Sequence, residues 1–144
     1  MSNRTAEKMP DLEGKTAVVT GANSGLGFEA TRKLAEHNAE VIMACRIKEK
    51  GLDAKEKIES EIEKADLRVM QVDLASLNSI QEFSKEFSSE YEKLDLLFNN
   101  AGVMAIPRRE TKDGFEYQFG VNHLGHFALT AQLMEALKKA EEAR

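Results

Sequence analysis

The sequence predicts an α/β fold in which a parallel sheet is covered by helices on both faces. Short runs of consecutive apolar residues alternate along the chain with longer segments that repeat an apolar residue every three or four positions. Strands that are apolar on successive residues are typical of a sheet buried on both faces. The chain has 144 residues, of which 42% are hydrophobic and 31% charged, and this composition indicates one ordinary globular domain.

Four apolar runs are expected to form the strands, and each is followed by a polar residue. The runs are 17–19, followed by Thr20; 41–45, followed by Arg46; 67–72, followed by Asp73; and 94–99, followed by Asn100. Right-handed crossovers between them give the strand order 3-2-1-4. The carboxyl ends of parallel strands meet at one edge of the sheet, so a ligand crevice is expected at that edge, between strands 1 and 4.

Three amphipathic segments between the strands are expected to be helices. Their apolar positions repeat at helical spacing: Leu26, Ala30 and Leu34 in the first; Ala54, Ile58, Ile62 and Ala65 in the second; Ile80, Phe83, Phe87 and Tyr91 in the third. A fourth helix contains Asn122, and Asp113 with Glu116 has the pattern of a cap at its start. We expect residues 1–13 to form a polar tail ahead of one folded unit over residues 14–144.

A glycine-rich segment joins the first strand to the first helix, and this arrangement favours phosphate binding. Glycine adopts positive φ readily, and the helix that follows points unpaired N–H groups at a bound anion. Gly21 is expected to make the turn, Gly25 to admit a pyrophosphate to the backbone, and Gly27 to let the helix pack closely. Asn23 and Ser24 are expected to add polar contacts. Taken alone, the glycine spacing also fits an ordinary strand-to-helix connection.

Arg46 ends the second strand about 20 residues beyond the last glycine, where a dinucleotide fold reads the adenosine ribose. No carboxylate stands there to bind a ribose 2′-hydroxyl. Because arginine offers five fixed donors to a 2′-phosphate, this position favours NADP over NAD. A surface arginine without this role is the alternative.

Four motifs together resemble the short-chain dehydrogenase/reductase family: 20–27, 73–74, 99–102 and 120–127. Their local character is similar to the retinol-dehydrogenase-like branch of that family. The motifs occur in the family's order over residues 15–137, which makes the set more specific than any single member. The resemblance implies a Rossmann-type sheet and hydride transfer between a nicotinamide and a carbonyl or alcohol substrate, and Arg46 favours NADP as the cofactor.

The resemblance also implies roles for individual residues. The cofactor-binding set is Gly21, Asn23, Ser24, Gly25, Leu26 and Gly27 in the turn, Arg46, Asp73 and Leu74 around the adenosine, and Asn100, Ala101 and Gly102 on the ribose and nicotinamide side. Asn122 is the implied catalytic residue and orders a water in a proton relay. A polar side chain bonded to the backbone of its own helix is the alternative for Asn122.

By the same resemblance, the family's catalytic set also includes a serine after the fifth strand and a Tyr-x-x-x-Lys on the next helix. Neither tyrosine of this chain begins such a motif, because Asp95 stands four positions after Tyr91 and Val121 four positions after Tyr117. The chain is therefore expected to hold the dinucleotide-binding half of such a protein and to stop before the fifth strand.

Three interpretations stay open. The first is an NADP-dependent oxidoreductase whose second half is absent from this chain. The second is a catalytically inert NADP(H)-binding module or assembly partner, and the third is a nonfunctional fragment. The sequence does not indicate the substrate, although residues 104–112 are candidates for its pocket. The apolar fourth strand is expected to be an open edge of the sheet. Together with the apolar stripe of the Asn122 helix, this edge predicts a homo-oligomer, an aggregation-prone chain, or association with a complementary half.

Composition excludes several other classes of function. The formal charge of −5 and the absence of a basic cluster argue against nucleic acid. No signal peptide or stretch long enough to span a membrane is visible, so no membrane partner is expected, although some animal retinol dehydrogenases carry an anchor. The single Cys45 fits a reducing cytoplasm. His123 and His126 lack accompanying ligand residues, so packing or helix hydrogen bonding is expected in place of metal binding.

Overall fold

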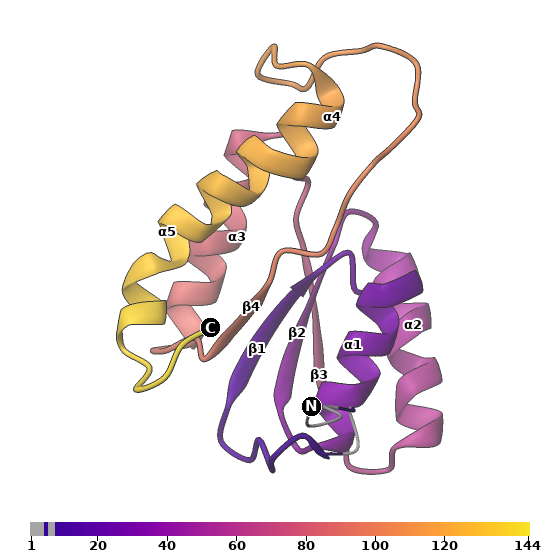
Figure 1. The fold of residues 1–144 in the computed structure, drawn as a ribbon, viewed down its shortest axis with the longest axis vertical. Coiled ribbons are helices and arrows are strands. Elements are labelled where there is room, and N and C mark those ends of the chain that lie inside the picture. Colours follow the sequence, from indigo (N-terminus) through magenta and orange to yellow (C-terminus); the bar gives the residue numbers. More distant parts are fainter. Residues whose placement is uncertain (1–4, 6–7) are drawn as a thin grey trace.

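The computed structural model describes residue 5 and residues 8–144, and these residues form one four-stranded parallel sheet. Its strands are β1 (Thr16–Thr20), β2 (Glu40–Cys45), β3 (Asp66–Gln71) and β4 (Leu96–Phe98). They lie in the order β3-β2-β1-β4, which confirms the order predicted from right-handed crossovers (Figure 1). Val18 in β1 lies between Ile42 of β2 and Leu97 of β4.

Helices cover both faces of this sheet, as predicted (Figure 1). One face carries α1 (Gly25–Glu36) and α2 (Lys48–Glu61), and the other carries α3 (Leu77–Glu90) and α5 (His126–Lys138). The one-turn helix α4 (Tyr117–Phe119) and the π-helix η2 (Gly120–Gly125) lead into α5 without a break. The π-helical turn therefore carries Asn122 and directly precedes the packed part of α5.

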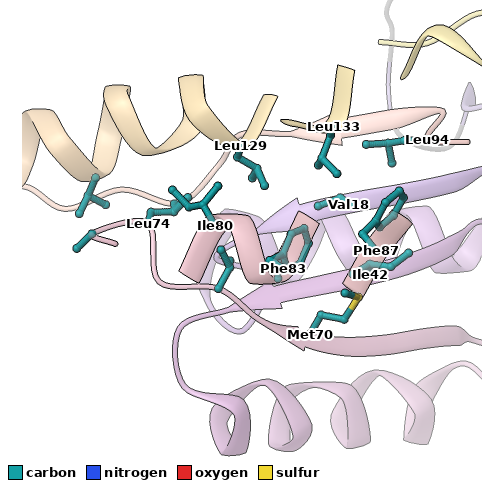
Figure 2. Packing of buried hydrophobic residues seen from close by; sticks show 14 of the residues in the cluster. Val18, Ile42, Met70, Leu74, Ile80, Phe83, Phe87, Leu94, Leu129 and Leu133 are labelled. Carbon is teal, nitrogen blue, oxygen red and sulfur yellow. The ribbon is translucent and has the colours of Figure 1, made fainter. Parts of the chain in front are cut away.

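Two hydrophobic clusters, one on each face, hold the layers together. Figure 2 shows Phe83 and Phe87 of α3 and Leu129 and Leu133 of α5, packed against Val18 and other sheet residues. The cluster on the opposite face joins Ala17 and Val19 of β1 to α1 and α2. All five residues of β1 are buried, which is what a strand covered on both faces requires.

The predicted apolar stripe of the first helix is wrong at its start. Leu26 is 82% exposed, and the buried face of α1 is instead formed by Gly27, Thr31, Leu34 and Ala35. Gly27 lies so close to the carbonyl oxygen of Gly21 that only a residue without a side chain fits against the strand. The neighbouring Leu26 instead lines the cleft at the carboxyl edge of the sheet.

The second and third helices end earlier than their apolar patterns predict. Helix α2 stops at Glu61, so Ile62 caps it and Ala65 lies in the turn before β3. Both side chains are partly buried against the cluster of that face. Tyr91 caps α3 in an extended conformation rather than forming its last turn. The apolar periodicity therefore continues into the capping residues, whose N–H groups still bond Ile58 O and Phe87 O, and in the second helix past the cap to Ala65.

The predicted pairing of Asp113 with Glu116 at one helix start is also wrong. Glu116 caps α4 alone, accepting hydrogen bonds from Gln118 N and Phe119 N at 3.0 and 2.8 Å. Asp113 Oδ2 instead accepts from Leu77 N at the start of α3, at 2.8 Å. A small antiparallel bridge between Glu110 and Glu116 carries Asp113 to this distant helix.

The outer side of β4 is not wholly unpaired, contrary to the expectation of an open edge. Arg144 N donates to Asp95 O at 3.0 Å, and Leu97 N donates to Arg144 O at 2.8 Å. The apolar face of the Asn122 helix is exposed as expected, with Phe127 69% and Met134 38% accessible. Oligomerisation stays a prediction.

The predicted tail lies partly outside the described residues, namely at residues 1–4 and 6–7. Of the described part, Met9 and Leu12 pack against the cluster beneath α1 and α2. Leu12 N also donates to His37 O at 2.7 Å. The division into residues 1–13 and 14–144 stays a prediction.

Candidate cofactor site

A cleft of about 620 Å³ opens at the carboxyl edge of the sheet, where the sequence predicts a ligand crevice. It is lined by most of the predicted site residues: Gly21, Asn23, Ser24, Leu26, Arg46, Asp73, Leu74, Asn100, Ala101, Gly102 and Asn122. Gly25 and Gly27 belong to the turn without lining the cleft. The structure thus brings together residues from four separate strand ends, because parallel strands all end at this edge.

The glycines of the turn meet three different steric demands. Gly21 has φ of 66°, and a Cβ there would lie 3.0 Å from the Ala101 Cα. Gly25 has φ of 55° and faces open space. A Cβ on Gly27 would overlap Gly21 O and lie 2.5 Å from Asn100 Nδ2. Glycine at 21 and 25 therefore provides the backbone conformation, whereas glycine at 27 provides the space for close packing.

The start of α1 presents backbone donors to the cleft. Ser24 precedes the helix in an extended conformation, and within the described chain its side chain makes no capping hydrogen bond. Gly25, Leu26 and Gly27 therefore keep first-turn N–H groups without a side-chain acceptor. A helix N-terminus with free N–H groups and a positive dipole end is suited to an anion such as a pyrophosphate.

Thr20, at the end of β1, connects the two sides of the cleft. Its hydroxyl accepts hydrogen bonds from Asn100 N at 2.9 Å and from Ala101 N at 3.0 Å. Asn100 Nδ2 in turn donates to Thr20 O at 2.9 Å. These bonds hold the loop after β4 against the glycine turn, so the Asn100 side chain acts as a brace between them.

His126 extends this network into α5 and is buried, with 6% exposure. Its Nε2 lies 2.8 Å from Thr20 Oγ1, and its Nδ1 lies 3.1 Å from Asn122 O. A carbonyl only accepts, so Nδ1 carries the proton and Nε2 accepts from the Thr20 hydroxyl. That hydroxyl is also 3.2 Å from Phe98 O, the longer of its two possible acceptors. Burial lowers the pKa of His126, which keeps the ring neutral.

The Asn122 side chain is fully engaged with the loop after β4. Its Oδ1 accepts from Val103 N and its Nδ2 donates to Val103 O, both at 2.8 Å. Gly125 allows this helix to approach closely, because a Cβ there would lie 2.5 Å from Leu74 O. Asn122 therefore fixes the wall of the cleft through its amide, and its implied catalytic role stays a prediction.

The end of the cleft beside β2 and β3 contains Arg46, Asp73 and a residue that sequence reasoning missed, Tyr117. Arg46 Nη1 donates to Tyr117 Oη at 3.2 Å. Asp73 Oδ1 accepts from Ala75 N at 3.0 Å, and its other oxygen lies 3.4 Å from Lys112 Nζ. One feature of the sequence could have indicated Tyr117 as a site residue. It stands four positions before Val121, so the two lie on one face of a helix, and both line the cleft.

Three features of the described part of the chain bear on other kinds of chemistry and location: its possible metal ligands, its free thiol and the length of its helices. Residue 5 and residues 8–144 contain no group of three His, Cys, Asp or Glu side chains that could hold a metal ion. Cys45 packs in the core, and its burial raises the pKa of the thiol to about 11. No helix among these residues is long and apolar enough to cross a membrane. The cytoplasmic location stays a prediction.

The parallel sheet, the glycine turn and the helix N-terminus beside a carboxyl-edge cleft define a dinucleotide-binding α/β protein. Residues 15–144 match the sequence model of the short chain dehydrogenase family. The chain therefore belongs to that family, whose members are oxidoreductases that use nicotinamide cofactors. This membership confirms the resemblance carried by the four motifs.

Known relatives are similar over most of this chain but are much longer. Retinol dehydrogenase 12 of Mus musculus is 47% identical over 133 residues, which are 92% of this chain and 42% of the relative. The crystal structure of an uncharacterized protein from Mycobacterium paratuberculosis has a TM-score of 0.83 at 43% identity, covering 93% of this chain and 47% of that one. The Pseudomonas aeruginosa RhlG/NADP active-site complex has a TM-score of 0.77 at 26% identity, covering 90% and 50%. The chain thus spans half or less of each of these three proteins.

Proposed function

We propose that this chain is the cofactor-binding half of an NADP-dependent oxidoreductase that acts on a carbonyl or alcohol substrate. The proposal rests on the position of Arg46, which directly follows β2 and lines the cleft. A guanidinium at this position suits a ribose 2′-phosphate, and no carboxylate stands there to bind a 2′-hydroxyl. The structural likeness to a protein in complex with NADP supports the same cofactor.

The residues of the cleft fit such a dinucleotide. The open space at Gly25 and the free N–H groups at the start of α1 suit the pyrophosphate. Asp73 and Leu74 would flank the adenine, and Asn100, Ala101 and Gly102 would line the ribose and nicotinamide side. When bound, the cofactor supplies or accepts a hydride at C4 of its nicotinamide. The protein's part is to hold that ring against the wall that Asn122 braces through Val103.

A second candidate function is an NADP(H)-binding module without catalysis. It is favoured by the absence of a Tyr-x-x-x-Lys motif from the 144 residues. Both tyrosine hydroxyls already have protein partners, since Tyr117 accepts from Arg46 and Tyr91 donates to Glu40. Neither tyrosine stands four positions before a lysine, as the family's tyrosine acid does by resemblance.

We expect NADPH to bind more tightly than NADH, and Arg46→Asp to abolish or reverse this preference. A charge-assisted hydrogen bond contributes about 1.5–3 kcal/mol, which is about ten- to a hundredfold in affinity. Fluorescence titration with both cofactors measures the effect. Lys50→Asp on α2 makes the same charge change at an exposed residue outside the cleft and should leave the preference intact. Equal affinities of the unaltered chain for NADPH and NADH would contradict the proposal.

We also expect the chain by itself to show no measurable dehydrogenase or reductase activity. Without a tyrosine acid, its lysine and the serine donor, a developing alkoxide has neither a proton source nor an oxyanion partner. The assay is NADPH oxidation with a panel of aldehydes and ketones, including retinaldehyde because a similar protein is a retinol dehydrogenase. Steady turnover that disappears in Asn122→Ala would show that this chain has catalytic machinery of its own.

A further inference from the structure

Arg46, which lines the cleft, and Arg109, which is not among its lining residues, share one tyrosine of the cleft wall. Arg46 Nη1 donates to Tyr117 Oη at 3.2 Å, and the guanidinium carbon of Arg109 lies 3.8 Å from the centroid of the same ring. Tyr117 is buried, with 8% exposure, whereas both arginines are exposed. The buried ring is held by its surroundings, and its contacts with the two guanidinium groups orient those groups in turn.

A short hairpin holds Arg109 and Tyr117 side by side. Tyr117 N donates to Arg109 O at 2.9 Å, next to the bridge between Glu110 and Glu116. The hairpin is attached to the wall of the cleft, because Lys112 N donates to Ala75 O at 2.9 Å. The loop after β4 thus reaches across the sheet edge and places both side chains beside the end of β2.

The cluster of Arg46, Arg109 and Tyr117 has two positive charges and no negative one. Within residue 5 and residues 8–144, neither Arg46 nor Arg109 forms a salt bridge with a carboxylate. Their common partner is neutral: the hydroxyl of Tyr117 accepts one hydrogen bond and its ring face attracts a cation. Each guanidinium carries five N–H donors, so most donors of Arg46 remain for a ligand. A phosphate dianion matches both the charge and the donors.

We propose that Tyr117 is a positioning residue for Arg46, and that Tyr117, Arg46 and Arg109 together form a preorganised site for the 2′-phosphate of NADP(H). This inference rests on the proposed function and extends it to two residues outside the strand-end motifs. A guanidinium that is already oriented loses less side-chain entropy when it binds phosphate, and this saving appears as affinity. Arg109 adds a second positive charge over the face of the shared ring.

The test uses two small ligands that differ in the 2′-phosphate, 2′,5′-ADP and 5′-AMP, titrated by calorimetry. Tyr117→Phe keeps the ring but removes the acceptor for Arg46, and it should weaken 2′,5′-ADP binding about three- to tenfold. Arg109→Gln changes an exposed residue and should weaken 2′,5′-ADP in the same range. Neither substitution should change the affinity for 5′-AMP. In an Arg46→Gln background, Tyr117→Phe should have no further effect, because the tyrosine acts through the arginine.

Tyr91→Phe is the matched control, since it removes the other tyrosine hydroxyl of the chain. That hydroxyl donates to Glu40 Oε1 at 2.8 Å, away from the cleft, so its loss should leave both ligands unaffected. Equal losses of 2′,5′-ADP and 5′-AMP in Tyr117→Phe would reveal a general packing role and overturn the inference. Unchanged 2′,5′-ADP affinity in Tyr117→Phe, in a chain that still prefers 2′,5′-ADP to 5′-AMP, would overturn this inference alone. A chain with no such preference would overturn both the inference and the NADP assignment.

Discussion

Gly27→Ala is expected to destabilise the protein by about 3 kcal/mol or more, the upper range for overpacking a tight contact. The added Cβ would overlap Gly21 O and lie 2.5 Å from Asn100 Nδ2. Neither neighbour can move freely, because Gly21 N is bonded to Ala44 O at 2.9 Å and Asn100 Nδ2 to Thr20 O at 2.9 Å. In a domain of this size the loss corresponds to about 10 °C in Tm, measured by calorimetry or circular dichroism.

Gly25→Ala is the matched control within the same turn. Its Cβ would meet nothing within 4 Å, so the cost is confined to the positive φ of 55°. That strain amounts to about 1–2 kcal/mol. We therefore expect a clearly smaller fall in Tm than for Gly27→Ala. Similar falls for the two variants would mean that backbone conformation, and not the space between α1 and the strand ends, is what position 27 requires.

His126→Ala is expected to destabilise the protein by about 3 kcal/mol, because it opens a cavity and removes the acceptor for a buried hydroxyl. The His126 ring fills a buried position between α5 and β1 and is bonded to Thr20 and Asn122. Denaturant unfolding at neutral pH measures the loss. A change below 1 kcal/mol would show that the Thr20 network holds together without the ring.

The same residue should make stability depend on pH. Since the pKa of His126 is lowered in the folded state by burial, the unfolded chain binds more protons than the folded one in acid. The contribution of neutral His126 to the free energy of unfolding is complete above the pKa of an unfolded histidine, about 6.5. It is lost as the pH falls below that value, toward the lower pKa of the folded state. Protonation would also place a donor on Nε2, where the Thr20 hydroxyl already accepts from Asn100 N and Ala101 N.

Unfolding free energies at several pH values between 5 and 8 test this dependence. His126→Gln, which cannot be protonated, should flatten the curve, whereas the exposed His123→Gln should leave it unchanged. The contribution of Asp95 lies at lower pH. Burial opposes its ionisation, but the hydrogen bond from Thr16 N and the nearby Lys15 outweigh this effect and lower its pKa. A slope that persists in His126→Gln would assign the pH dependence to other groups.

The architecture could be predicted from the sequence because the strands are visible as local apolar patterns and their order follows from a general rule of topology. Successive apolar residues indicated strands buried on both faces, and right-handed crossovers then left one strand order. The lining of the cleft followed from the same rule, since residues that follow parallel strands meet at one edge. The helix ends, by contrast, were misplaced at Ala65 and Tyr91, because apolar spacing reports burial and continues into the flanking turns.

The amino-acid sequence by itself determined the order of the strands, the edge at which the cleft opens and most of the residues that line it. Only the tertiary structure decided which side chains meet across that cleft. His126 bonds Thr20 over 106 positions, and Arg46 bonds Tyr117 over 71. The spacing of residues along the chain does not predict such pairs. Each contact depends on where a helix or hairpin lies relative to the edge of the sheet. Strand order follows from local patterns, whereas these contacts exist only once the layers have packed.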